Sequence, residues 1–306
     1  MPVQETATLT PQSLTSNGYT LSSAPNRLGW LTRSDPDASI SSLREQYDEQ
    51  GYLWLKGILD RADILDFRRR YFAAFADTGL VRCDIDPGEG IYDGAKEDKN
   101  LIRKLQMETH RWAAYEAFCL AKPIYQFYES FFEGAVYLHK RKLIRHVPPG
   151  DVSTTGAHYD LVYFRAGTDA VCTSWIPIGD TPPEMGGLIY LENSHHFGRR
   201  KEAEFTALNA DLEPEERINA FNKNMGLHGW LTKDLPALAD RLDTRWLMAD
   251  YEAGDMVVHG AYTTHAATAN ASPDCRIRLS TDIRYQRVKE EIDIRWSNHW
   301  SFDDVQ

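Results

Sequence analysis

Residues 155–167 read TGAHYDLVYFRAG, and this segment carries the first indication of the fold. Its Val, Tyr and Phe residues predict a buried strand. Successive side chains on a strand point to opposite faces, so His158 and Asp160 would share one face. A buried aspartate is costly unless it is paired or bound to a metal ion. The pair therefore predicts a site for a first-row divalent metal on a core strand.

The segments around this pair alternate in the way expected of a jelly roll. Short β-rich runs separated by Pro, Gly and Asp turns follow residue 135, which is typical of an all-β sandwich or jelly roll. Helical patterning dominates residues 37–80, where 51–59 is an interrupting strand, and returns over 101–134. A Gly- and Asp-rich loop is expected at 81–100. The predicted fold class is α+β, mainly β, with N-terminal helices packed on a C-terminal β core.

The domain organisation follows from composition. Residues 1–30 are rich in Ser, Thr and Pro and predict a flexible arm without the apolar segment of a signal peptide. No composition shift marks a linker, so residues 31–306 are expected to form one domain. Within it, residues 199–246 predict a polar helical insert, a position suited to a lid.

Charge and cysteine content exclude several classes of protein. The chain has 306 residues, a formal net charge of −11 and a pI near 5.4, which argues against nucleic-acid or anionic-membrane binding. No apolar run of about 18 residues predicts a membrane span. The four cysteines form no CxxC pair, so a reducing, cytoplasmic location is expected. A small-molecule substrate is the expected partner, and the sequence allows a homodimer.

A third metal ligand is expected far downstream of the His-x-Asp pair. His265 lies in GDMVVHGAYTTHAATAN, residues 254–270, and two histidines with one carboxylate leave coordination positions open for oxygen and a co-substrate. His259, six residues earlier, is an alternative ligand. Arg276 follows in a strand-like run, where a dicarboxylate ligand would supply the partner that a buried arginine needs. Arg278 is an alternative to it, because strand alternation puts both on one face.

Four segments in order resemble the phytanoyl-CoA dioxygenase family of iron(II)- and 2-oxoglutarate-dependent oxygenases. They are YDEQGYLWLKGIL, HYDLVYF, SWIPIGDTPPEMGGLIYLENSHHFG and GDMVVHGAYTTHAATANASPDCRIRLSTDIRY. The resemblance covers the chain from about residue 40 onward and implies a double-stranded β-helix. Its most specific element is the spacing after His265, with Asn270 five and Arg276 eleven residues later, and this spacing favours Arg276 over Arg278.

The resemblance implies roles for individual residues. His158, Asp160 and His265 correspond to the iron ligands, and Arg276 to the arginine that binds the distal carboxylate of 2-oxoglutarate. Further co-substrate contacts are expected from Trp175 and Ser280, whereas Ala267 stands where relatives often have serine. Asp160 occupies the position that halogenating relatives leave open, so oxygenation or desaturation is implied.

The expected activity is that of a dioxygenase using Fe(II), 2-oxoglutarate and O2. It would hydroxylate, desaturate or rearrange a small, natural-product-like molecule. The alternatives are a metal-dependent isomerase or epimerase and a non-catalytic binding module on the same jelly roll. Loops and the insert supply the expected substrate contacts, which are Tyr92, Phe164, Arg165 and Trp230.

Overall fold

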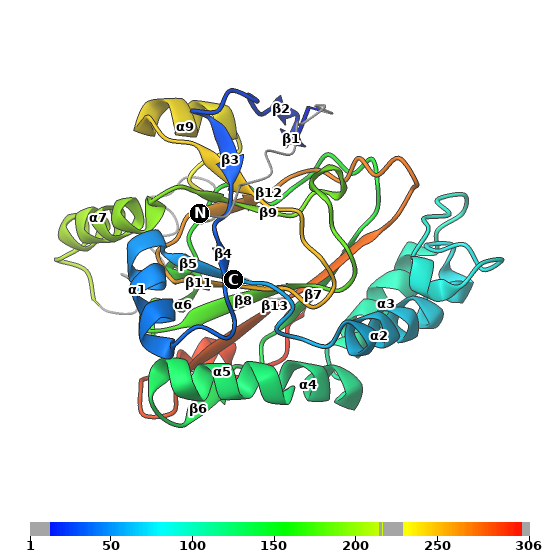
Figure 1. Ribbon diagram of the computed structural model, residues 1–306, viewed down its shortest axis with the longest axis horizontal. Helices are drawn as coiled ribbons and strands as arrows, with labels where there is room; N and C mark the ends of the chain where they lie inside the picture. Colours follow the sequence, from blue (N-terminus) through cyan, green and yellow to red (C-terminus); the bar gives the residue numbers. More distant parts are fainter. Residues whose placement is uncertain (1–12, 214–215, 217–228, 302–306) are drawn as a thin grey trace.

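Two β-sheets face each other at the centre of the protein (Figure 1). The computed structural model describes residues 13–213, 216 and 229–301. Six strands of the large sheet lie side by side, and a seventh pairs with β13 along its edge. In order they are β4 (Arg33–Ser34), β5 (Tyr52–Leu55), β11 (Met256–Gly260), β8 (Cys172–Pro177), β13 (Arg278–Arg287) and β6 (Val136–Leu138), with β7 (Leu143–Val147) on β13.

The smaller sheet forms the opposite wall. Its order is β12 (His265–Ala267), β9 (Leu188–Leu191), β10 (Trp246–Met248) and β3 (Leu28–Trp30). A separate hairpin joins β1 (Thr15–Ser16) to β2 (Tyr19–Thr20). Two facing, mostly antiparallel sheets confirm the predicted jelly-roll core.

Helices cover the outer face of the large sheet and flank the small one (Figure 1). The helices of the first half are α1 (Ile40–Gln50), α2 (Arg61–Ala74), α3 (Lys99–Thr109), α4 (Ala113–Cys119) and α5 (Lys122–Phe132). Later in the chain come α6 (Leu161–Phe164), α7 (Ser194–Leu208) and α9 (Leu235–Leu242). Among the described helices, none is long and apolar enough to cross a membrane.

Local sequence explains the ends of the first helices. The Ser39 side chain accepts a hydrogen bond from the backbone N–H of Ser42 at the start of α1, and Asp60 caps α2 in the same way. Gly51 ends α1 with φ of 77°, and a Cβ there would lie 2.7 Å from the His195 ring. Strand β5 interrupts the helices as expected.

The core has two main parts. The larger buries aromatic side chains of α2 and α5 against the outward-facing residues of β13, among them Leu279, Ile283 and Tyr285. A second cluster lies between the sheets and includes Trp54, Trp175, Tyr190 and Tyr251. These aromatic groups fill only part of the space between the sheets, and a pocket occupies the remaining part.

Three expectations about local structure need correction or qualification. Residues 158–164 were expected to form a strand, but the chain makes a single antiparallel bridge from His158 to His265 and then turns at Asp160 into α6. The expected arm of residues 1–30 is ordered in part, because β3 pairs in parallel with β10; residues 1–12 lie outside the described structure. The expected insert, 199–246, contains most of α7 and all of α9, and its residues 214–215 and 217–228 are also outside the description.

Candidate metal centre and its pocket

Three predicted ligands meet at one buried point between the sheets. His158 and His265 exchange backbone hydrogen bonds of 3.0 and 2.9 Å, so their side chains leave neighbouring backbone segments together. His158 Nε2 lies 3.6 Å and His265 Nε2 3.7 Å from the same oxygen, Asp160 Oδ1. The candidate ligand atoms of the three residues all lie within 4.8 Å of one another. The structure therefore brings together the His-x-Asp…His set expected from the sequence.

Backbone carbonyls set the orientation of both histidine rings. His158 Nδ1 lies 2.9 Å from the carbonyl oxygen of Gly156, and His265 Nδ1 lies 3.0 Å from that of Thr263. Donation from Nδ1 to these carbonyls leaves the lone pair of each Nε2 directed toward Asp160. Burial lowers the pKa of His158 and holds the pKa of His265 well below its usual value. Both rings are thus neutral at pH 7, the form that binds metal.

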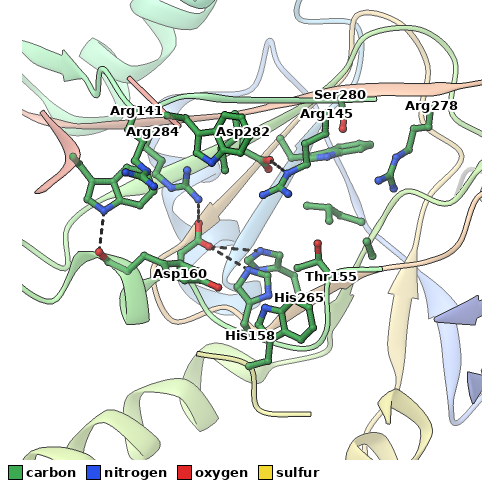
Figure 2. Close-up of a pocket in the computed structure, with 18 residues that line it drawn as sticks. Arg141, Arg145, Thr155, His158, Asp160, His265, Arg278, Ser280, Asp282 and Arg284 are labelled. Atoms are coloured by element: carbon green, nitrogen blue, oxygen red, sulfur yellow. Dashed lines mark hydrogen bonds and ion pairs between the residues drawn. The ribbon is translucent and has the colours of Figure 1, made fainter. Parts of the chain in front are cut away.

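The two oxygens of Asp160 have different surroundings (Figure 2). Oδ2 accepts hydrogen bonds from Thr173 Oγ1 at 2.5 Å and from Arg284 Nη2 at 3.2 Å. Oδ1 is buried and has no hydrogen-bond partner among the described residues. Burial acts to raise the pKa of Asp160, but Arg284, His259 and His265 outweigh it and hold the pKa well below its usual range. The carboxylate stays charged and presents one unsatisfied oxygen to the two Nε2 atoms.

His259, the alternative ligand, lies behind the carboxylate. Its Nε2 is 3.5 Å from Asp160 Oδ2, the oxygen that also faces Thr173 and Arg284, and its Nδ1 is 3.2 Å from the Tyr190 hydroxyl. His259 is on β11, the strand before β12, and is fully buried. It supports Asp160 from the outer side, whereas His265 faces Oδ1.

Strand β13 supplies four pocket residues at alternate positions: Arg278, Ser280, Asp282 and Arg284. Arg278 is buried and donates from Nη1 to the carbonyl of Gly186, while its Nε has no partner among the residues described. Burial lowers its pKa to about 10, so it remains a cation at neutral pH. The Ser280 hydroxyl is likewise buried without a partner in the described chain. A cation and a hydroxyl two residues apart offer a site for a carboxylate.

Arg276 does not lie in this pocket, and the prediction that it would is wrong. Its side chain is 43% exposed and forms a 3.0 Å ion pair with Glu89 near the protein surface. Strand alternation fails here because β13 begins only at Arg278. Cys275, just before, has φ of 55°, so the chain turns ahead of the strand. Arg278, the alternative, is the arginine that reaches the pocket.

The pocket around the candidate ligands has a volume of about 280 Å³. Trp175 on β8 and Trp230 line it, as expected. The other lining residues are Arg141, Leu143, Arg145, Thr155, His158, Asp160, Tyr163, Leu188, His265, Ala267, Arg278, Ser280, Asp282, Arg284, Trp296 and Trp300. Aromatic and arginine side chains therefore dominate a space that contains the metal site.

Three of the four expected substrate residues do not line the pocket. Tyr92 donates a hydrogen bond to Glu97 at 3.1 Å, away from the site. Arg165 pairs with Glu202 at 2.6 Å. Phe164 is buried behind the pocket, where its ring lies 4.1 Å from that of Trp296 and 4.9 Å from the Arg284 guanidinium. Phe164 thus packs against a pocket residue without facing the cavity.

Several site residues were missed by reasoning from the sequence. Thr173 and Arg284 hold Asp160, and Arg145 and Asp282 form an ion pair of 3.3 Å at the cavity wall. The sequence did contain a signal for Arg284 and Asp282, because polar residues recur at every second position from 278 to 284. On a strand this places them on one face, and buried polar side chains on one face indicate a site.

A family model described as phytanoyl-CoA dioxygenase (PhyH) matches residues 47–278. The chain belongs to the phytanoyl-CoA dioxygenase family. Membership and the His-Asp-His set confirm the enzyme class expected from the sequence, a 2-oxoglutarate-dependent oxygenase that uses Fe(II), 2-oxoglutarate and O2. Ser280, Asp282, Arg284, Trp296 and Trp300 lie beyond the matched residues.

Named relatives and solved structures agree with this assignment. A 1-deoxypentalenic acid 11-beta-hydroxylase from Streptomyces arenae is 24% identical over 246 residues, covering 78% of each chain. The epimerase SnoN of nogalamycin biosynthesis, solved with Fe3+, alpha ketoglutarate and nogalamycin RO, superposes with a TM-score of 0.54 at 17% identity, over 84% of this chain and 87% of that one. EctD from S. alaskensis gives 0.53 at 13% identity, over 93% and 87%. These structural likenesses show the shared fold.

Proposed function

We propose that this protein is an Fe(II)/2-oxoglutarate-dependent dioxygenase that oxidises a C–H bond of a small, natural-product-like molecule. His158, Asp160 and His265 would hold the iron, and Arg278 with Ser280 would bind the distal carboxylate of 2-oxoglutarate. One observation carries the proposal. The pocket that contains the triad also contains a buried arginine and a buried hydroxyl, each with an unsatisfied polar atom among the described residues.

The donor set fits iron(II) on chemical grounds. Two neutral imidazoles and one carboxylate are the ligands of non-haem Fe(II) oxygenases, and they leave positions open on one side of the metal. Asp160 Oδ1 is a buried acceptor whose missing partner a metal ion would supply. When bound, iron and 2-oxoglutarate supply the oxidising chemistry, which belongs to the cofactors rather than to the protein.

The residues of the chain would bind the metal and 2-oxoglutarate and orient them in the pocket. Arg284 and Thr173 fix the Asp160 carboxylate through Oδ2, so that Oδ1 remains available to a metal. Arg278 offers a cation for the dicarboxylate, and Trp175 on the neighbouring strand β8 closes the wall beside it. The burial of all three candidate ligands keeps water away from the centre.

The relatives support a natural-product substrate. The Streptomyces arenae relative is named for the hydroxylation of 1-deoxypentalenic acid, and SnoN and SnoK belong to nogalamycin biosynthesis. SnoN is described as an epimerase, so product analysis must accompany any measurement of 2-oxoglutarate consumption. An oxygen atom gained by the product indicates hydroxylation, and loss of two hydrogens indicates desaturation.

Visible spectroscopy of the anaerobic protein tests the assignment. Fe(II) chelated by 2-oxoglutarate gives a weak charge-transfer band, so we expect the band in the wild type and its loss in Asp160→Ala. Arg278→Leu removes a charged hydrogen-bonding group worth about 1.5–3 kcal/mol, so the 2-oxoglutarate concentration at half-saturation should rise roughly 10- to 100-fold.

Arg276→Leu is the matched control, because it removes an arginine two residues away that faces Glu89. It should leave the half-saturation concentration within about two-fold of the wild-type value. A band that depends on Arg276 and not on Arg278 contradicts the clamp assignment. An iron-loaded protein without any band contradicts the 2-oxoglutarate assignment as a whole.

A further inference from the structure

A third arginine of the pocket, Arg145, has no role in binding iron or 2-oxoglutarate as assigned above. It lies on β7, directly opposite Ser280 of β13 in the antiparallel register. Its side chain faces the same cavity as Arg278 and Ser280. Figure 2 shows Arg145 and Asp282 on the side of the pocket opposite His158 and His265. Arg145 is thus placed across the cavity from the metal ligands.

The four arginines of the pocket differ in their surroundings, and Arg141 is buried with its guanidinium 5.1 Å from the centre of the Trp296 ring. Arg284 is buried and pairs with Asp160, and Arg278 is buried next to Ser280. Arg145 is 47% exposed and contacts Asp282 through Nε, at 3.3 Å from Oδ2. The terminal Nη1 and Nη2 atoms of Arg145 have no hydrogen-bond partner among the described residues. Held by Nε, the guanidinium presents a fork of two N–H donors that matches the two oxygens of a carboxylate.

Arg145 also lies where two cavities meet. A second cavity of about 230 Å³ shares six lining residues with the first: Leu143, Arg145, Thr155, Ala267, Arg278 and Trp300. Aromatic rings accompany these shared residues, since Tyr163 and Trp230 line the first cavity and Trp300 lines both. A ligand that reaches from the metal centre toward the second cavity passes two arginines, Arg278, which is assigned to 2-oxoglutarate, and Arg145, which is not.

We propose that Arg145 selects a substrate that carries a carboxylate on an apolar, ring-containing body. This inference rests on the proposed function, because it assigns Arg278 to 2-oxoglutarate and thereby leaves Arg145, the half-exposed arginine of the pocket, for the substrate. Asp282 acts as the positioning residue that orients Arg145. Its negative charge beside the fork disfavours a dianion, so a carboxylate fits better than a phosphate ester.

Paired probes test the proposal without knowledge of the natural substrate. The Fe(II)-loaded protein is saturated with 2-oxoglutarate under anaerobic conditions, so that the metal and Arg278 are already engaged. Benzoate, adamantane-1-carboxylate and biphenyl-4-carboxylate are then titrated calorimetrically, each against its own carboxamide, with phenyl phosphate as a further anion. We expect at least one carboxylate to bind ten-fold or more tightly than its amide, and more tightly than phenyl phosphate.

Variants assign the preference to Arg145. Arg145→Gln should remove the difference between carboxylate and amide, Arg145→Lys should keep part of it, and the exposed Arg70→Gln on α2 should keep all of it. The affinity for 2-oxoglutarate, read from the visible band, should stay within two-fold in Arg145→Gln. This last readout separates a substrate residue from one that binds the co-substrate.

Four results would overturn the inference: no carboxylate binds more tightly than its amide, phenyl phosphate binds most tightly, the preference survives Arg145→Gln, or this variant loses 2-oxoglutarate affinity ten-fold. Failure of the proposed function looks different. In that case the wild type shows no band with 2-oxoglutarate, whereas the probe titration can still be read on the metal-loaded protein.

Discussion

The two faces of the β7–β13 strand pair contrast sharply, although the residues alternate along the same two strands. The face toward the pocket carries Arg145, Arg278 and Arg284, and the face toward the helices carries apolar residues together with His146. His146 contacts the Tyr71 hydroxyl at 2.7 Å, and burial lowers its pKa to about 4. Within residues 143–147 and 278–285, the charged side chains of the pair thus lie on the pocket face.

The contrast shows what a charge needs in order to remain between two sheets. Arg284 keeps its charge beside the Asp160 carboxylate, and Arg278 faces the cavity in which we propose that 2-oxoglutarate binds. On the helix side no carboxylate of the described residues pairs with His146, and burial makes the neutral ring the stable form. Each buried arginine that this strand pair contributes to the pocket thus has a counter-charge or faces the cavity.

Replacement of Asp160 should have the largest effect on the stability of the buried charges. Asp160→Ala leaves Arg284 buried without its counter-charge, and removal of one partner of a buried ion pair costs about 3–5 kcal/mol. We expect a loss of this order in the free energy of unfolding of the metal-free protein, measured by urea denaturation. The variant should also retain no stoichiometric Fe(II).

Asp282→Ala is the control for this experiment. It removes a carboxylate from the same wall, but its partner Arg145 is half-exposed, so the cost should be under about 1 kcal/mol. Equal losses from the two variants would show that burial of the partner is not what decides the cost.

Three buried, neutral histidines outside the metal site predict a pH dependence of stability. Burial lowers the pKa of His110, His139 and His146 to about 4 each. Between this value and the ordinary 6.5, the unfolded chain binds more protons than the folded one, so stability falls as the pH falls. Each histidine should cost about 2 kcal/mol at pH 5 relative to pH 7 or above.

A single substitution isolates one of these contributions. Urea denaturation of His139→Gln at pH 7 and pH 5 should show a pH-dependent loss smaller by about 2 kcal/mol than in the wild type. Asp160 does not contribute in this window, since its pKa is depressed and its stabilisation disappears only at more acidic pH. An unchanged difference between the two pH values would mean that His139 is protonated in the folded protein.

The sequence predicted the composition of this site better than its backbone. His158, Asp160 and His265 were found from residue type and order, because few buried environments accept a histidine and an aspartate together. The same segment was assigned to a strand, yet a bridge and a turn serve equally well to bring His158 and Asp160 to one point. Residue preferences for strands say little about a segment fixed by one tertiary contact.

The choice between Arg276 and Arg278 shows a second limit. Alternation assigns both to one face only if the strand already includes Arg276, and the first residue of a strand is poorly determined by sequence. The turn at Cys275 depends on a positive φ at a residue type that rarely adopts it. Only the three-dimensional structure shows that Arg278 is buried against the Gly186 carbonyl and that Arg276 is exposed beside Glu89.

A smaller effect is expected from Arg284→Gln, which tests whether the pocket face acts on the metal through Asp160. Groups that orient a metal ligand typically contribute 10- to 100-fold to metal affinity. We expect the dissociation constant for Fe(II), measured by anaerobic titration, to rise within this range. Arg287→Gln, three residues later, removes an arginine that contacts the Phe132 carbonyl and should leave the constant unchanged. A similar rise in both variants would indicate a general loss of sheet order.

The smallest effect is expected at Ala267, on the sheet that faces this strand pair. Ala267 lines the same cavity as Arg278, so Ala267→Ser would add a hydroxyl on the side opposite the proposed clamp. One added hydrogen bond is worth about 0.5–1.5 kcal/mol, so the affinity for 2-oxoglutarate should rise roughly two- to ten-fold. The concentration dependence of the visible band measures this change. Ala266→Ser is the matched control, because Ala266 packs in the apolar cluster with Ile189 and Trp246. It should lower stability without changing that affinity, and weaker 2-oxoglutarate binding in Ala267→Ser would show that the co-substrate already fills the space beside β12.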